Sequence, residues 1–66
     1  MNIIVNSIEI EVEQGISIQQ LIVEKNIVSK YIAVEINKYI VPKSDYQEYK
    51  LKDGDQIEII TAIGGG

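Results

Sequence analysis

Residues 2–22, NIIVNSIEIEVEQGISIQQLI, change their hydrophobic period at Gly15. Before the glycine, aliphatic residues alternate with glutamates, a period of two that is typical of a half-buried strand. After it, Ile18, Leu21 and Ile22 have the i, i+3, i+4 spacing of a helix that buries one face. The sequence therefore predicts a strand followed by an amphipathic helix.

A shorter strand precedes the alternating one, so the two predict a β-hairpin. Asn2–Val5 is apolar, and Asn6-Ser7 is a plausible turn because both side chains bond local backbone. The alternating strand places aliphatic residues on one face and glutamates on the other: Ile8, Ile10 and Val12 against Glu9, Glu11 and Glu13. Carboxylates spaced along one strand face do not converge on a metal or a cationic substrate. We interpret them as the solvated face of an edge strand.

The predicted helix has start and stop signals. Ser17 is a natural N-cap, and Gln20, three residues later, completes a capping box. Ile16 and Leu21 occupy the hydrophobic staple positions on either side of that cap. Asn26 tolerates the left-handed conformation and predicts the C-terminal end of the helix.

The remaining chain predicts three strands separated by turns. The expected elements are a strand in YIAVEIN (31–37), a tight turn at Asn37-Lys38, a strand in YIV (39–41) stopped by Pro42, a single helical turn begun by Ser44 or Asp45, a turn in KDGDQ (52–56) with Gly54 at positive φ, and a strand in QIEIIT (56–61). The order β-β-α-β-β-β gives one core only if the helix packs across one face of a mixed sheet. We expect an α+β fold, with residues 1–66 forming one domain whose tail, residues 64–66, is flexible.

Composition argues against several classes of site and partner. The 66 residues include no Cys and no His, so neither a disulfide nor a Cys/His zinc site can form. The formal net charge of −4 argues against nucleic acid, because phosphate binding needs clustered Lys and Arg. No apolar run approaches the roughly 20 residues of a membrane span, and no signal-like region opens the sequence. We expect a cytoplasmic protein without a metal site.

Side chains offer little for catalysis. A His general base and a Cys nucleophile are both missing, and the serines have turn or cap interpretations: Ser7, Ser17, Ser29 and Ser44. Residues 53–55, DGD, supply too few carboxylates for a calcium loop and are interpreted as a turn. The aromatic residues are not at stacking spacing on one strand, and core-edge packing is expected for all four: Tyr31, Tyr39, Tyr46 and Tyr49.

The remaining reactive group is the α-carboxylate of Gly66. Three glycines, residues 64–66, end the sequence, and a frayed terminus is the plainest interpretation of them. In the alternative interpretation, these residues extend at most roughly 10 Å beyond Ile63. Without side chains they fit a narrow channel in another protein and deliver the carboxylate to a buried site.

Two segments are similar to a known family. AVEINKYIVPKSDY (33–46) and LKDGDQIEIITAIGGG (51–66), together with the element order and length, resemble the thiamine-biosynthesis sulfur carrier family, which has a ubiquitin-like β-grasp fold. The most specific parts are IN followed by IVP, then KDGD, a strand and Gly-Gly. Family members often have Gly at Lys38, Trp near Tyr46 and Arg at Lys43, departures that concern turn shape and surface.

The resemblance implies chemistry at one residue. An ATP-using, ubiquitin-activating-like adenylyltransferase would adenylate the Gly66 carboxylate. Persulfide sulfur, supplied by a sulfurtransferase or cysteine desulfurase, would then displace the adenylate and leave a thiocarboxylate. Thiazole synthase would accept the sulfur. Gly64 and Gly65 would occupy the partner channels, and the chain itself would bind no cofactor.

Strand parity predicts where a partner docks. If Ile57 and Ile59 face the helix, the opposite parity faces outward. That outward set comprises Ile60 and Ala62, beside Ala33 and Glu35 of the neighbouring strand. Ile60 and Ala62, with Ile63, would form a small exposed apolar patch for partner binding.

The residues leave alternatives open. The small subunit of molybdopterin synthase shares the Gly-Gly end but is usually longer between the helix and the third strand. Carriers for cysteine or thio-metabolite synthesis share the same chemistry. A ubiquitin-like modifier would join the same carboxylate to lysine, and a β-grasp binding module would have an inert tail.

Overall fold

The computed structural model describes residues 1–62 and confirms the predicted element order. The elements are β1 (Asn2–Val5), β2 (Ile8–Glu11), α1 (Ile18–Glu24), β3 (Ile32–Ile36), β4 (Tyr39–Val41), the 3₁₀ helix η1 (Lys43–Asp45) and β5 (Gln56–Thr61). The helical turn begins earlier than predicted, because the Asp45 N–H donates to the Pro42 carbonyl at 2.9 Å and closes the turn around Lys43. Neither of the helices within residues 1–62 has the length and apolar character needed to cross a membrane.

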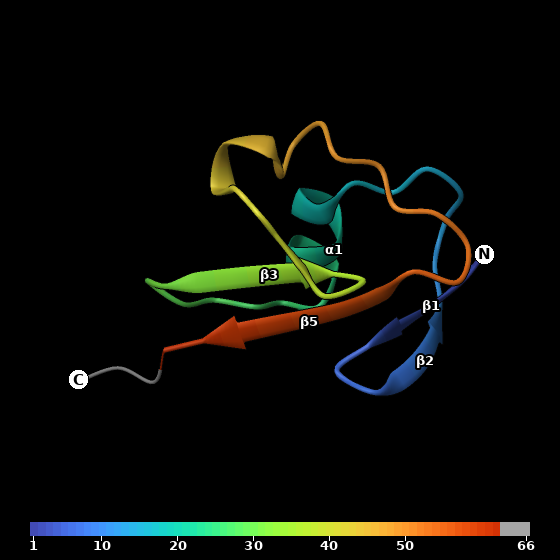
Figure 1. Ribbon diagram of the computed structural model, residues 1–66, viewed down its shortest axis with the longest axis horizontal. Coiled ribbons are helices and arrows are strands. Elements are labelled where there is room, and N and C mark those ends of the chain that lie inside the picture. The colour runs from blue at the N-terminus through green and yellow to red at the C-terminus, as the bar shows by residue number, and fades with distance from the viewer. Residues whose placement is uncertain (63–66) are drawn as a thin grey trace.

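The strands form one mixed sheet in the order β2-β1-β5-β3-β4. β1 and β5 are parallel, with Ile4 opposite Gln56 and Val5 opposite Ile57, and the other pairs are antiparallel. α1 lies across one face of this sheet (Figure 1). β2 and β4 are the edge strands, so the glutamates of β2 lie on an exposed edge as predicted.

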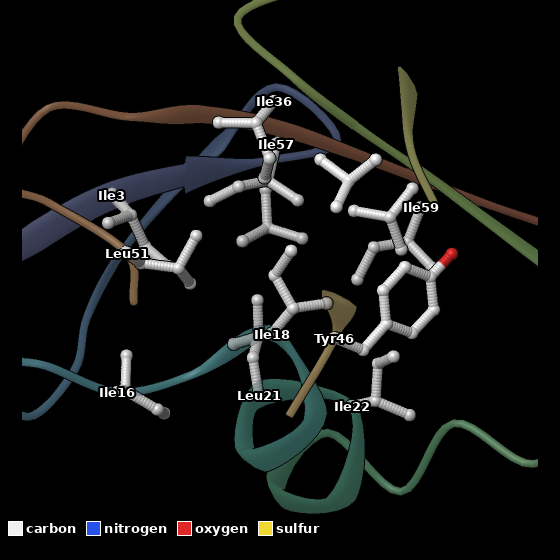
Figure 2. Packing of buried hydrophobic residues seen from close by; sticks show 13 residues of the cluster. Ile3, Ile16, Ile18, Leu21, Ile22, Ile36, Tyr46, Leu51, Ile57 and Ile59 are labelled. Atoms are coloured by element: carbon white, nitrogen blue, oxygen red, sulfur yellow. The ribbon is translucent and has the colours of Figure 1, made fainter. Parts of the chain in front are cut away.

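The core lies between α1 and the sheet. Ile18, Leu21 and Ile22 are the buried residues of the helix. Figure 2 shows them pointing toward Ile57 and Ile59 of β5, which are 1% and 7% exposed. The burial of alternate residues in β5 confirms the period-two interpretation of the sequence.

Both ends of α1 are capped as predicted. The Gln20 N–H donates to Ser17 Oγ at 3.1 Å, and the Ser17 N–H donates to Gln20 Oε1 at 2.9 Å. At the other end Asn26 has φ +54°, and its N–H donates to the Val23 carbonyl. The Ile27 N–H donates to the Ile22 carbonyl, and this second bond completes a Schellman motif. A helix of seven residues therefore has hydrogen-bond partners at both termini.

Both hairpins have tight two-residue turns whose residues have positive φ. Asn6 and Ser7 have φ of 49° and 70°, and Asn37 and Lys38 have φ of 50° and 74°. The Asn6 amide also bonds across the sheet, accepting from the Ile59 N–H at 2.9 Å and donating to the Ile59 carbonyl at 3.3 Å. The asparagine thus continues the contact between β1 and β5 beyond the last backbone pair.

Side chains at the ends of the edge strands are exposed, and the predicted core-edge packing is wrong for Tyr39. Ile8 is 66% exposed although it pairs with the buried Val5, and Tyr39 is 78% exposed although it pairs with the buried Ile36. Each lies on an edge strand, where only one neighbouring strand can cover it.

The prediction that the tyrosines pack at the edge of the core is confirmed for Tyr46 and is wrong for Tyr31 and Tyr49. Tyr46 is 4% exposed, and its burial raises the pKa of its phenol above the ordinary 10.0. Figure 2 shows the Tyr46 ring pointing into the core from the segment after β4. Tyr31 is 60% exposed because it precedes β3 on the side of the sheet away from the helix, and Tyr49 is 36% exposed.

Candidate functional site

The candidate site is the end of β5, where the described chain leads toward the glycines. Two bonds hold Ala62: its N–H donates to the Tyr31 carbonyl, and its carbonyl accepts from Ser29 Oγ, both at 3.2 Å. The single hydroxyl hydrogen of Ser29 is shared with the Tyr31 carbonyl, whose oxygen lies 2.9 Å from Oγ. Ser29 therefore fastens the segment before β3 to the last described residue of the chain.

Four of the predicted site residues lie outside the described residues. They are Ile63, Gly64, Gly65 and Gly66. Ile60 and Ala62 are described, and the predicted parity is confirmed: Ile60 is 52% exposed and Ala62 is exposed, whereas Ile59 is buried. Ile60 pairs with the exposed Ala33 of β3, so the two lie together on the sheet face opposite α1.

Ile40 extends this apolar surface and was missed from the sequence. It is 75% exposed and pairs with Glu35, on the same face as Ala33 and Ile60. A signal was present, because the two-residue turn at Asn37-Lys38 fixes the register of the β3–β4 hairpin. That register, with Val41 buried, turns Ile40 outward.

A hollow of about 330 Å³ adjoins the end of β5. Its lining combines apolar residues with two lysines: Tyr31, Ile32, Ala33, Ile60, Thr61 and Ala62, with Lys30 and Lys43. Lys30 Nζ lies 5.8 Å from the centre of the Tyr31 ring, within reach of a cation–π interaction. The end of β5 is therefore an apolar hollow beside ammonium groups.

The carboxylates of the DGD segment accept hydrogen bonds from backbone N–H groups. Asp53 Oδ1 accepts from the Asn2 N–H at 2.8 Å, and Asp55 Oδ2 accepts from the Lys52 N–H at 2.8 Å. Gly54 has φ +85°, which confirms the turn interpretation. Residues 1–62 contain no group of three or more acidic side chains placed to hold a metal ion.

Known proteins are similar to this chain over nearly its whole length. A family model described as the ThiS family matches residues 2–66. The sulfur carrier protein ThiS of Bacillus subtilis is 42% identical over 50 residues, which are 76% of this chain and 76% of that protein. A thiazole synthase of Paramagnetospirillum magneticum is 38% identical over 66 residues, which are all of this chain and 20% of that protein.

A solved structure supports the same assignment. The crystal structure of the thiamine biosynthesis protein (ThiS) from Geobacter metallireducens matches with a TM-score of 0.86 at 26% identity, over 100% of both chains. The mixed five-stranded sheet with one helix is thus the ubiquitin-like β-grasp fold that the sequence predicted. By sequence and by fold, the chain belongs to the ThiS family.

Proposed function

We propose that this chain is a cytoplasmic sulfur carrier of thiamine biosynthesis and that its working group is the Gly66 α-carboxylate. The observation that carries the proposal is the family match, which extends through the terminal glycines. The chain is a co-substrate of partner enzymes in this scheme. It has no Cys or His that could divert an activated acyl group to an internal side chain.

The proposed chemistry turns a poor electrophile into a reactive one. A carboxylate oxygen of Gly66 attacks the α-phosphorus of ATP on a ubiquitin-activating-like adenylyltransferase, and pyrophosphate leaves. A persulfide from a sulfurtransferase or cysteine desulfurase then attacks the acyl carbon, and AMP leaves. A thiolate then attacks the donor's sulfur in the resulting acyl disulfide. A new disulfide forms between the thiol and the donor, and the Gly66 thiocarboxylate leaves. ATP is used by the activating enzyme and is not a resident cofactor of this chain.

The geometry of β5 supports delivery of the tail to a partner. β1 pairs with β5 only at Gln56 and Ile57, and β5 then continues beyond the β1–β2 turn (Figure 1). Ala62 is anchored by Ser29 and Tyr31, and only Ile63 separates it from the first glycine, Gly64. A partner that binds the exposed apolar residues around Ile60 would receive Gly64 and Gly65 in its channel.

Thiazole synthase is the proposed sulfur acceptor. The thiazole synthase of Paramagnetospirillum magneticum contains a segment similar to this entire chain within a longer polypeptide. A second thiazole synthase, from Magnetococcus marinus, has a segment 35% identical to 82% of this chain. Carrier-like sequence within the synthase polypeptide supports a working pair of carrier and synthase.

Intact mass after reaction with the adenylyltransferase, ATP and a sulfur donor tests the proposal. We expect a gain of about 16 Da, since one carboxylate oxygen is replaced by sulfur. Oxidation of Met1 adds nearly the same mass, so fragmentation must place the gain on Gly66 and accurate mass must identify sulfur.

A variant lacking Gly65 and Gly66 is the matched control. It should gain no sulfur and should unfold at the same denaturant concentration, because the two removed glycines have no side chains to bury. An unmodified full-length chain would contradict the proposal and favour an inert binding module. A ladder of conjugates on lysines would instead indicate a ubiquitin-like modifier.

A further inference from the structure

The outer face of β3 and β5 carries three successive rows of side chains. Glu35 pairs with Glu58, and Ala33 pairs with Ile60 one row closer to the end of β5. The third row is formed by Tyr31 and Ala62, which are joined by a backbone hydrogen bond. Along the direction of β5 this face changes from acidic to apolar.

The acidic row is unfavourable for the fold itself. Glu35 and Glu58 are directly opposite each other on neighbouring strands, and like charges in that position destabilise a sheet. Both line a hollow of about 310 Å³ that Lys38 also lines, so its lining includes two acidic residues and one basic residue. A basic side chain from a partner would find an opening with residual negative charge.

Two lysines line the hollow at the far end of this face. Lys30 and Lys43 both line the hollow at Ala62, and the Tyr31 ring lies close to the Lys30 ammonium. These lysines are two of only six basic residues in a chain with ten acidic ones. We call the outer face of β3 and β5, together with the hollow at Ala62, the docking face. Its charge changes along β5: it is acidic at Glu35 and Glu58, apolar at Ile60 and basic at Lys30.

We propose that this polarised face orients the adenylating enzyme during docking. The proposal rests on the function proposed above and adds the chemistry of the partner surface. That surface carries a basic side chain opposite Glu35 and Glu58, an apolar side chain against Ile60, and an acidic side chain opposite Lys30. If the partner were rotated by half a turn on this face, like charges would meet. Only the matched orientation directs the tail into the active site.

Charge-reversal variants test this orientation through the kinetics of adenylation. We expect E35K/E58K to raise KM for the carrier about tenfold with kcat little changed, because rim charges act on encounter and binding. The control E24K/E48K makes the same change in net charge at exposed positions outside the sheet, in α1 and in the turn after η1, and should leave KM within about twofold. Equal losses in both double variants would overturn the proposal.

Lys30→Glu separates an oriented face from general attraction to a basic partner. If only overall negative charge mattered, K30E would lower KM. The polarised face predicts that KM rises about threefold, so a lowered or unchanged KM would overturn the proposal.

The milder variant E35Q/E58Q distinguishes a role in docking from a role in holding the fold together, because the two roles predict opposite changes in thermal stability. It should raise KM while also raising the midpoint of thermal unfolding, since it removes the opposed charges. A rise in KM accompanied by a loss of stability would count against the proposal. Wild-type carrier that forms no adenylate even at saturating enzyme would instead refute the proposed function, a result distinct from all of these.

Discussion

Lys38 occupies a backbone conformation that disfavours its own side chain. Its φ of +74° lies at the second position of the β3–β4 turn, where an Asn-Gly pair is the preferred sequence. Replacing Lys38 with Gly should stabilise the protein by about 0.5–1 kcal/mol, because a left-handed backbone costs any residue with a Cβ. Urea unfolding measures the change.

Lys38→Ala is the matched control for this prediction. Alanine removes the charge and keeps the Cβ, so the free energy of unfolding should stay within about 0.5 kcal/mol of the wild type. If Lys38→Gly were less stable than Lys38→Ala, the unfolded-chain entropy of glycine would outweigh the relief of strain. That result would contradict the prediction.

At the residue scale the sequence predicts turn positions but not the bonds that turn side chains make across the sheet. Asn6 and Asn37 were recognised as turn residues from their own propensities. The structure adds that Asn6 bonds Ile59, and that Asn37 Oδ1 accepts from the Gln56 N–H at 3.0 Å. Such bonds join positions far apart in the sequence, and local propensity carries no information about them.

At the element scale, α1 depends on its N-terminal cap. A helix of seven residues is too short to be stable by propensity alone, and Ser17 is only 3% exposed. Ser17→Ala should therefore cost about 1–2 kcal/mol, the upper part of the range for an N-cap, since burial prevents water from replacing the hydroxyl. Urea unfolding of the variant gives the value.

Ser44→Ala, at an exposed serine of η1, should change stability by less than about 0.5 kcal/mol. The comparison separates the cap from a general effect of serine replacement. Equal free energies of unfolding for the two variants would show that the capping box contributes little.

Elements were predictable where local signals agree, and burial was not predictable at the edges. The capping box, the alternation in β5 and the turn at Gly54 each depend on residues close in sequence. Ile8 has the correct parity for the core yet is 66% exposed, because exposure depends on the position of β2 at the sheet edge. Strand order is a property of the whole fold and cannot be read from period alone.

At the scale of the whole molecule, strand parity predicts some residues of the docking surface, and only the structure identifies the others. Ile60 and Ala62 follow from the alternation of β5. Ile40 can be assigned to this surface only from the register of the β3–β4 hairpin. Lys30 and Glu58 can be assigned to opposite ends of it only from the pairing of β3 with β5. The chemistry at Gly66 has a different source, since residue patterns left several carriers open and family resemblance favoured one of them.

Ile60→Ala tests whether this surface docks the activating enzyme. Ile60 is 52% exposed, so its truncation removes little packing within the protein. If it contacts the partner, the loss of about 1 kcal/mol of binding raises KM for adenylation roughly fivefold, while kcat stays unchanged. Steady-state kinetics with the adenylyltransferase and ATP measure both constants.

Ile8 provides a control matched in residue type and exposure. It is 66% exposed but lies on β2, separated from β5 by β1, so Ile8→Ala should leave KM unchanged. Both variants should unfold within about 0.5 kcal/mol of the wild type, since neither side chain belongs to the core. An unchanged KM for Ile60→Ala would remove Ile60 from the interface. A rise in KM for Ile8→Ala alone would move the docking surface to the β1–β2 hairpin, away from the end of β5 from which the glycines extend.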